Sequence, residues 1–440
     1  MKRVATSAAL LAVLVLVSAG VAGGAPDSRH GPTKLTVWVG WSAGHELTSF
    51  KKLAAEYQSQ HKDVTLSVVG GIVDTKIVAA IRAGNAPDVI SSFNSYNVGV
   101  FCGTGGWIDL APLMKQSNIS ASIFPPTALY YTQYNGTRCA LPLLADSYGL
   151  YYNKDLFKKA GIAGPPKTMS ELFADAKKLT VKNPDGSLKV VGIDPFIGLY
   201  ENVPERWAIG YGAKWIDAKG HSLIGSDPAW AKWLQFQKKL VDWYGYNNLV
   251  KFNAGVQDEF SASNAFEIGK VAMNLDGEWR VSFIQHEHPT LNYGTAPMPV
   301  DDAHPELYGS GYVNGTIIGI PKNGHNRDKA WQLVKWLTTD THALAEFSNA
   351  IRNVPSTTAS TVSKELTPDA HFSTFLKIFA NAHSGTSPIM ASGQSYTNLV
   401  QSFVTKWQAG QVKDLGGDLK TLARELDAQV KQAKGGGGVP

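Results

Sequence analysis

The chain contains few cysteines: Cys102 and Cys139 are the two among its 440 residues. A structural zinc site needs more ligands than this pair supplies, so the cysteines predict no zinc centre. In an oxidising compartment, two cysteines favour a single disulfide, which here would close a loop of about 37 residues. Two buried free thiols are the alternative interpretation.

Charge is also sparse. Charged residues make up 18% of the chain, and 41 Lys and Arg against 36 Asp and Glu leave a net charge of +5. A nucleic-acid-binding protein needs a clustered basic face, which this dispersed charge does not supply. The composition predicts a globular protein without a nucleic-acid partner. The length predicts two or three domains, or one domain built in two lobes.

The one long apolar run lies at the amino terminus. Ala8–Val17 follows the basic pair Lys2 and Arg3 and precedes a stretch of small residues, a pattern typical of a signal peptide over residues 1–25. A membrane anchor is the alternative, but the run is short for a span of about 20 residues. Because no cysteine lies near the cleavage region, we expect no lipid anchor. The mature protein should be soluble and periplasmic, or otherwise extracytoplasmic, with residues 435–440 as a flexible tail.

Two catalytic motifs, H-E-x-x-H and the phosphate-binding P-loop, are absent. Residues 285–288 (QHEH) resemble a metal site, but histidines two apart do not share one helical face, so we expect a polar loop before Pro289 and no metal. Asp146, Asp276 and Glu278 could include a glycosidase carboxylate pair, although sequence does not give their separation. The sequence predicts no catalytic residue and no cofactor.

Strand and helix patterns alternate along the chain, which favours an α/β fold with parallel pairing. Alternating or short apolar runs predict strands at Lys34–Gly40, Val64–Val69, Asp88–Ser91, Ser147–Tyr152 and Ile317–Ile320. Apolar residues at helical spacing predict helices at Leu47–His61, Thr75–Ala83, Lys154–Ala160, Ser170–Thr180, Asp227–Trp243, Lys329–Leu337 and Leu415–Lys434. Thr168 with Glu171 has the spacing of a capping box.

Aromatic residues near strand ends and in glycine-rich loops indicate a binding site without chemistry. A sugar offers apolar ring faces to aromatic side chains and hydroxyls to carboxylates and amides. The candidate aromatics are Trp41, Trp207, Trp279, Tyr312 and Tyr396, and their polar neighbours include Ser42, Asp276 and Glu278. Ligands of open α/β sheets bind beyond the carboxyl ends of strands, where Trp41 and Asn94 follow the first and third strands. For Trp230, Trp233, Trp331 and Trp336 we expect core packing.

Four stretches together resemble signature segments of the family 1 extracellular solute-binding proteins, the sugar-binding subunits of ABC importers. They are KIVAAIRAGNAPDV (Lys76–Val89), the segment Asn135–Lys178 containing YYNKDLF and PPKTMSEL, GKVAMNLDGEW (Gly269–Trp279) and IGIPKNGHNRDKAWQLVKWL (Ile318–Leu337). The resemblance covers essentially the whole mature chain. Two features depart from the family: the usual lipid-attaching cysteine is missing, and the Cys102–Cys139 pair is not a general family feature.

The resemblance implies a type II periplasmic-binding-protein fold, in which two α/β lobes, each a mostly parallel sheet flanked by helices, close over a ligand cleft. The implied first lobe comprises residues 34–143 and 318–365, and the second comprises 146–307 and 370–434. Hinge crossings are implied at 144–145, 310–316 and 367–370. The implied ligand-binding residues are Trp41, Ser42, Asn94, Asp146, Tyr148, Trp207, Glu278, Trp279, Gly311, Tyr312 and Tyr396.

The implied function is capture of a sugar, by our interpretation a di- or oligosaccharide, and its delivery by a monomeric protein to a membrane permease of an ABC importer. A non-sugar ligand, such as a polyamine, a glycerophosphodiester or an iron complex, is the alternative within the same role. A secreted glycoside hydrolase and a chemoreceptor ligand-presenter are further alternatives.

Overall fold

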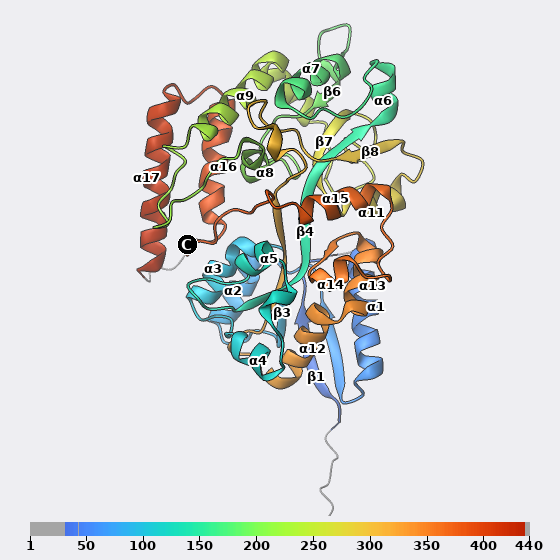
Figure 1. The fold of residues 1–440 in the computed structure, drawn as a ribbon, viewed down its shortest axis with the longest axis vertical. Coiled ribbons are helices and arrows are strands. Elements are labelled where there is room, and N and C mark those ends of the chain that lie inside the picture. Colours follow the sequence, from blue (N-terminus) through green and yellow to red (C-terminus); the bar gives the residue numbers. More distant parts are fainter. Residues whose placement is uncertain (1–30, 43, 436–440) are drawn as a thin grey trace, which may run out of the picture.

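The computed structural model of the chain describes residues 31–42 and 44–435. The predicted signal peptide and, apart from Gly435, the predicted tail lie outside the described residues. The described chain forms two lobes stacked along the long axis of the molecule, with β4 and β9 running between them (Figure 1). No helix of the described part is long and apolar enough to cross a membrane.

The strands have the following bounds: β1 Thr33–Trp38, β2 Val64–Val69, β3 Val89–Ser92, β4 Ala140–Asn153, β5 Val181–Lys182, β6 Leu188–Ile193, β7 Val271–Gly277, β8 Tyr293–Ala296, β9 Val313–Gly319 and β10 Val354–Pro355. They form one sheet in the order β2-β1-β3-β9-β4-β7-β6-β5, and β8 and β10 also pair with β4.

The helices of the lower lobe in Figure 1 are α1 Gly44–Gln60, α2 Asp74–Arg82, α3 Val98–Gly103, α4 Ala111–Gln116, α5 Pro126–Tyr130, α12 Arg327–Thr339, α13 Thr341–Ile351 and α14 Thr358–Thr361. Those of the upper lobe are α6 Lys154–Lys159, α7 Met169–Leu179, α8 Pro204–Ala208, α9 Pro228–Tyr244, α10 Tyr246–Asn253, α11 Arg280–Glu287, α15 Ala370–Ala380, α16 Ser395–Gln408 and α17 Leu415–Lys434. Short 3-10 turns lie at Ser95–Asn97, Ala121–Ile123, Ile209–Tyr211 and Pro305–Leu307.

The lower lobe follows the sequence pattern closely. In β1, the alternating residues Leu35 and Val37 are buried, and β1 pairs in parallel with β2 and β3. On α1, the residues with helical spacing, Phe50, Leu53, Ala54 and Tyr57, are buried against this sheet. The predicted capping box of α7 in the other lobe is also present, with both of its reciprocal hydrogen bonds.

The upper lobe departs from the expected parallel pairing. There β4 pairs antiparallel with both β7 and β8, and β5 pairs antiparallel with β6, so only the β6–β7 pair is parallel among its described strands. The expectation of a mostly parallel sheet is therefore wrong for this lobe. The physical reason is that parallel neighbours need a crossover connection, usually a helix. Strand β4 instead enters the upper lobe directly as the continuation of a strand of the lower lobe, so no crossover helix sets its direction. In the lower lobe the expectation holds for β1, β2 and β3 but not for β9, which pairs antiparallel with β3 and β4.

Strand β4 is longer than the sequence predicts. It runs from Ala140 to Asn153 and is buried almost throughout. Its first half pairs with β9 and its second half with β7 and β8. The prediction missed the first half, where Pro142 suggests a break. The structure places a register irregularity between Pro142 and Leu144, which accommodates the residue that cannot donate a backbone hydrogen bond.

Residues 285–287 are not a loop as expected but the last turn of α11. Val281, Phe283 and Ile284 supply the buried face of this helix, and His286 Nδ1 lies 2.7 Å from the Ser282 carbonyl oxygen, one turn earlier. His288 follows the helix directly, before Pro289 disfavours its continuation. The signal for this helix in the sequence was the short apolar face that follows the DGEW segment.

The two cysteines are joined in a disulfide whose Cα atoms lie 5.4 Å apart. Cys102 lies in α3, Cys139 directly precedes β4, and both belong to the hydrophobic core of the lower lobe. The bridge therefore ties α3 to the start of the strand that crosses between the lobes.

The lobes contact each other directly. His45 at the start of α1 stacks on His286 of α11, with ring centroids 4.3 Å apart, and its Nε2 lies 3.0 Å from Ser282 Oγ. Elsewhere the Tyr312 hydroxyl donates to the Tyr96 hydroxyl at 2.9 Å. After α15 the chain also returns toward the lower lobe (Figure 1). There a Cβ on Gly99 of α3 would lie 1.9 Å from the Met390 carbonyl oxygen. Only glycine permits that approach.

Candidate functional site

A cavity of about 300 Å³ lies where the two lobes meet. Its aromatic wall residues are Trp41, Phe93, Tyr96, Tyr148, Tyr200, Phe260 and Trp279. Its charged wall residues are Glu46, Asp146, Glu201, Glu205 and Arg206, and its amides are Asn94, Asn314, Asn353, Gln394, Asn398 and Gln401. The strand ends and loops of the lower lobe supply one side, and β4, α8, α16 and the start of α11 supply the other.

Two tryptophans from different lobes contribute to the wall. Trp41 follows β1 and is braced by Phe50, Phe93 and Phe347, whose ring centroids lie 5.1–5.4 Å from its own. Trp279 lies between β7 and α11 with its ring edge-on to Tyr148 at 5.4 Å, and its Nε1 has no hydrogen-bond partner among the described residues. Fixed rings of this kind offer flat apolar surfaces to a ligand.

Asp146 on β4 lies at the floor of the cavity. Its Oδ1 accepts a hydrogen bond of 2.8 Å from Asn353 Nδ2, which also donates to Glu278 Oε1 at 3.2 Å. Burial, reinforced by the charge of Glu201, raises the pKa of Asp146 to about 7. Burial, together with the charge of Asp146, likewise raises the pKa of Glu46 to about 7. These carboxyl groups therefore titrate near neutral pH.

Helix α8 and the loop before it bring a cation into the wall. The Arg206 guanidinium forms an ion pair with the Glu201 carboxylate and donates to the Glu201 carbonyl oxygen at 2.5 Å. It also lies 3.9 Å from the centroid of the Tyr148 ring, which is within cation–π range. Glu205 is buried beside it, burial raises its pKa, and its Oε2 has no partner among the described residues.

The structure brings together one part of the predicted site. The predicted residues on the cavity wall are Trp41, Asn94, Asp146, Tyr148 and Trp279. Those that do not line it are Ser42, Trp207, Glu278, Gly311, Tyr312 and Tyr396.

Most of the predicted residues that do not line the cavity are buried in the protein. Trp207 lies in the core of the upper lobe and donates from Nε1 to Asn202 Oδ1. Glu278 is fully buried and accepts from the Ser147 amide at 2.8 Å. Tyr312 packs behind Tyr148 with ring centroids 5.7 Å apart.

The other three differ from one another. Tyr396 belongs to the core of the upper lobe and neighbours Trp215. Gly311 lies so close to β4 that a Cβ there would be 2.7 Å from the Tyr148 carbonyl oxygen. Ser42 is exposed to solvent.

Sequence reasoning missed the charged part of the wall. Glu201, Glu205 and Arg206 stand in the segment GLYENVPERW next to the predicted Trp207. In a helix, successive residues face different directions, so Trp207 turns into the core while its two neighbours line the cavity. Three charges within six residues, between Tyr200 and Trp207, were the signal available. Asn353, from the short β10 region, carried none.

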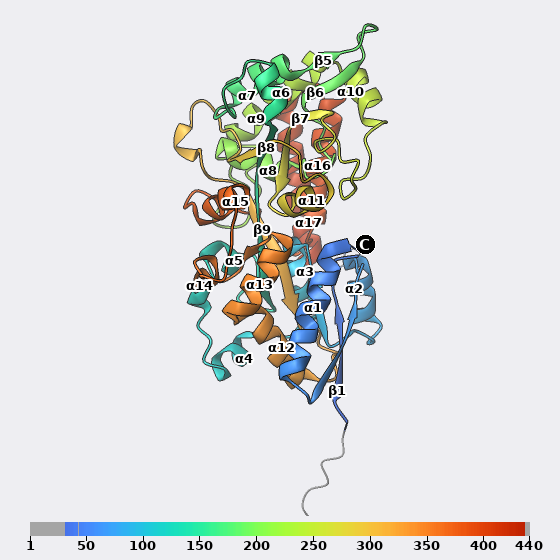
Figure 2. The same cartoon turned by 90° about the vertical axis from the view of Figure 1, so that its right-hand side faces the viewer.

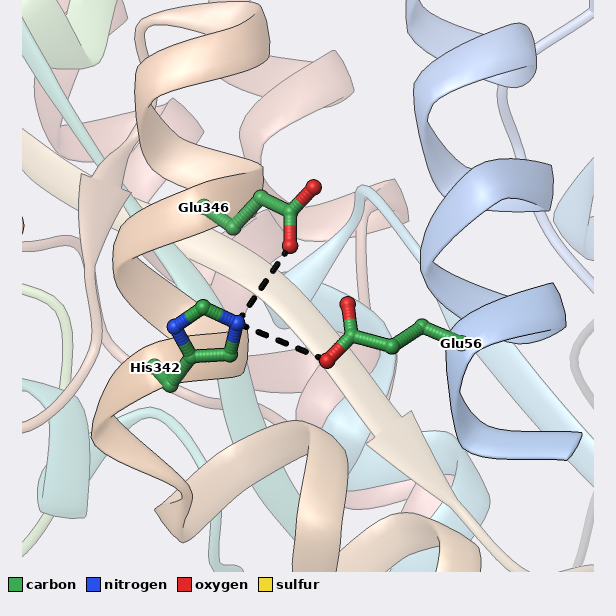
Figure 3. A group of neighbouring side chains, drawn as sticks. All are labelled: Glu56, His342 and Glu346. Carbon is green, nitrogen blue, oxygen red and sulfur yellow. Dashed lines mark ion pairs between the residues drawn. The ribbon is translucent and has the colours of Figure 1, made fainter. Parts of the chain in front are cut away.

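One group of side chains has the composition of a metal site, away from the cavity. His342 and Glu346 of α13 and Glu56 of α1 point toward one another on the surface of the lower lobe (Figure 3). His342 Nε2 lies 3.4 Å from Glu56 Oε1 and 3.6 Å from Glu346 Oε2. Lys52 is paired with Glu346 at 2.7 Å. Because Lys52 and His342 already pair with these carboxylates, the group is satisfied as an ion-pair network.

Comparisons with known proteins agree with this architecture. The maltotriose-binding protein of Pyrococcus abyssi (strain GE5 / Orsay) is 24% identical over 75% of this chain and 68% of its own length. The sn-glycerol-3-phosphate-binding periplasmic protein UgpB of Agrobacterium fabrum (strain C58 / ATCC 33970) is 35% identical, but over only 29% of this chain and 31% of its own length. The solved structure of CpMnBP1 with mannotriose bound superposes with a TM-score of 0.79 at 27% identity, covering 90% of this chain and all of that one.

A family model also matches more than half of the chain. Residues 43–343 match the model of the bacterial extracellular solute-binding proteins. This match agrees with the two-lobed α/β fold, with the cavity between the lobes and with the four sequence segments that resemble the family. The chain belongs to the family of bacterial extracellular solute-binding proteins.

Proposed function

We propose that this protein captures a saccharide between its lobes and delivers it to an ABC importer. The observation that carries the proposal is the cavity wall: aromatic rings from both lobes stand beside carboxylates and amides from both lobes. Rings stack on the apolar faces of a sugar, and the polar groups bond its hydroxyls. The maltotriose and mannotriose of the two relatives favour a di- or oligosaccharide ligand.

The lobes of this proposal are residues 34–143 with 318–365 and residues 146–307 with 370–434. They move about crossings at 144–145, 310–316 and 367–370. A ligand held by Trp41 and Asn94 on one lobe and by Tyr148 and Trp279 on the other binds the closed state better than the open one, so it shifts the population toward closure. The proposed ligand contacts are these wall residues and Asp146, with Glu201, Glu205, Arg206 and Asn353 added from the structure.

The partner in this proposal is the membrane permease of an ABC importer, which the loaded protein meets transiently as a monomer. The protein works outside the cytoplasm, and residues 1–25 direct its export. It performs no catalysis. Glu278 lies outside the cavity wall and Asp276 is paired with Arg280 at 2.9 Å, so the carboxylates considered for glycoside hydrolysis do not form a pair that flanks a bound sugar.

A thermal-shift screen of the purified protein tests the proposal. The panel contains mono-, di- and oligosaccharides, glycerol 3-phosphate and spermidine. A saturating ligand that binds only the folded state raises the melting temperature, by several degrees at a concentration of about 100 times Kd. We expect a saccharide to do so. If spermidine or glycerol 3-phosphate alone raises the melting temperature, the proposed saccharide ligand is wrong, and the proposed binding role remains.

Variants locate the site. Trp279→Ala removes a wall ring and should weaken saccharide binding by up to about tenfold, since aromatic contacts of this kind contribute about 0.5–1.5 kcal/mol. Trp243→Ala is the matched control, because Trp243 packs against Tyr244 on α9 and does not line the cavity. Equal losses of affinity in the two variants would show that the cavity is not the binding site.

A further inference from the structure

The cavity wall carries more acidic than basic side chains. Glu46, Asp146, Glu201 and Glu205 face one cation, Arg206, which is the single basic side chain on the wall among the described residues. A ligand that enters this space leaves water behind, and charge interactions strengthen as water is excluded. The sign of the wall therefore bears on which ligands the cavity accepts.

The one cation is already engaged. Arg206 forms an ion pair with Glu201, and the face of its guanidinium rests on Tyr148 at 3.9 Å. Its charge is largely balanced before any ligand arrives. An anionic ligand would have to compete with Glu201 for Arg206 while lying close to the other three carboxyl groups.

A second cation, Arg280, lies beneath the wall but adds no positive charge to the cavity. It is fully buried and holds Asp276 at 2.9 Å, Glu267 at 3.0 Å and Glu259 at 3.5 Å. Three acids around one guanidinium leave no positive charge to offer the cavity.

The acidic excess coincides with unsatisfied acceptors. Glu205 is 5% exposed and lines the cavity, and its Oε2 has no hydrogen-bond partner among the described residues. The same holds for the side-chain carbonyl oxygens of Asn314 and Asn353, which are 4% and 6% exposed. A buried acceptor without a partner costs about 1–3 kcal/mol, which a donor-bearing ligand recovers. An ammonium group offers three donors and no acceptor, whereas a phosphate at neutral pH offers chiefly acceptors.

The aromatic wall suits the same chemistry. Tyr148 already receives one cation on its face, in Arg206. Tyr96 and Trp279 add electron-rich rings to the wall, and such faces attract ammonium groups more strongly where water is excluded. Carboxylates and aromatic rings together form the usual environment for an organic cation.

We propose that the ligand of this cavity is an amine-bearing saccharide, with its ammonium group received by Glu205 and its neighbouring acceptors. This inference rests on the proposed function and narrows its substrate class. The cavity selects a cationic sugar over the neutral sugar of the same skeleton, and it rejects phosphorylated sugars and uronic acids.

Matched ligands test the selection. Isothermal titration calorimetry of the purified protein at pH 7 compares glucosamine, galactosamine and mannosamine with glucose, galactose and mannose, and with glucuronic acid. The same comparison is made between the di- and trisaccharides of β-1,4-linked glucosamine, N-acetylglucosamine and glucose. We expect the best amine-bearing ligand to bind at least tenfold more tightly than its neutral counterpart, and the difference to shrink in 1 M salt.

Two variants assign the selection to the wall. Glu205→Gln keeps the shape of the side chain and removes its charge, so the affinity for the amine-bearing ligand should fall at least tenfold more than the affinity for its neutral counterpart. Asp146→Asn serves the same purpose if Glu205→Gln does not fold. The control is Glu306→Gln, because Glu306 is an exposed glutamate that does not line the cavity.

The outcomes separate the inference from the proposed function. A neutral sugar that binds as tightly as its amine counterpart, or an unchanged preference in both variants, overturns the inference and leaves sugar capture standing. Spermidine binding without any saccharide binding overturns both the inference and the saccharide ligand and leaves only the binding role, as does tight binding of glycerol 3-phosphate alone.

Discussion

Two groups of buried acids in this protein differ in how their charge is balanced. Around Arg280, the carboxylates of Asp276 and Glu267 are fully buried and each lies within 3.0 Å of the guanidinium. In the cavity, Asp146 and Glu205 are almost as buried, yet the single nearby guanidinium is paired with Glu201. Burial of a charge is costly unless it is compensated inside the protein. The first group has its compensating cation within the fold, whereas Asp146 and Glu205 have no cation of their own.

The largest expected effect comes from breaking the group around Arg280. Arg280→Met would leave Asp276 and Glu267 buried without their cation, and removal of one partner from a buried ion network typically costs about 3–5 kcal/mol. Denaturant unfolding of the ligand-free protein measures the loss. Lys52→Met is the control, since Lys52 is an exposed lysine paired with a glutamate and should leave the unfolding midpoint unchanged. Equal stability of Arg280→Met and wild type would show that the network does not stabilise the fold.

A medium effect of opposite sign is expected in the cavity. Asp146→Asn removes a buried charge that has no cation of its own, and its amide oxygen can still accept from Asn353. We expect the ligand-free variant to be more stable than wild type at pH 8, by about 2 kcal/mol, because burial raises the pKa of Asp146 to about 7. Asp276→Asn, which breaks the pair with Arg280, should instead destabilise. Unfolding at pH 8 checks both signs, and two destabilising variants would remove the distinction between the groups.

The smallest effect is a pH slope. The folded pKa values of Asp146 and Glu46 are raised to about 7, so the folded state holds their protons, and the stability that they contribute is lost as pH rises toward 7. His45 acts in the opposite direction. Burial, with the nearby charge of His286, lowers its pKa to about 4, so its contribution falls as pH drops from 6.5 to 4.

His45→Gln should therefore steepen the loss of stability of the ligand-free protein between pH 5 and pH 7, by about 1 kcal/mol over that range. Thermal unfolding at half-unit pH steps measures the slope, and Asp146→Asn should flatten it. Identical slopes for wild type and both variants would mean that neither residue titrates between those pH values.

Local patterns predicted the elements well. The capping box at Thr168, the buried face of α1 and the alternation within β1 follow from short-range rules, because each depends on residues only a few positions apart. The antiparallel pairing of the upper lobe could not be predicted in this way. It depends on β4 and β7, which are more than a hundred residues apart in sequence.

The residues of the candidate site divide in the same way, into those that local patterns locate and those whose position depends on tertiary packing. Trp41, Asn94 and Asp146 follow from strand ends and from the family resemblance, so sequence could place them on the wall. Tyr396 and Trp207 have equally suggestive neighbours, yet the packing of the upper lobe draws both rings into its core. Which of two aromatic residues faces a cavity depends on helix rotation about tertiary contacts, and no spacing rule in a single sequence reports that rotation.

Strand β4 places part of the cavity wall at the junction of the two lobes. Asp146 and Tyr148 lie where this strand changes partners, from β9 in the lower lobe to β7 and β8 in the upper lobe. In the proposed closure this point is the pivot, and the tips of the lobes lie farthest from it (Figure 2). A shift of a few tenths of an ångström at these two side chains would then become a displacement many times larger at the outer surfaces, which are the surfaces that the proposed permease would contact.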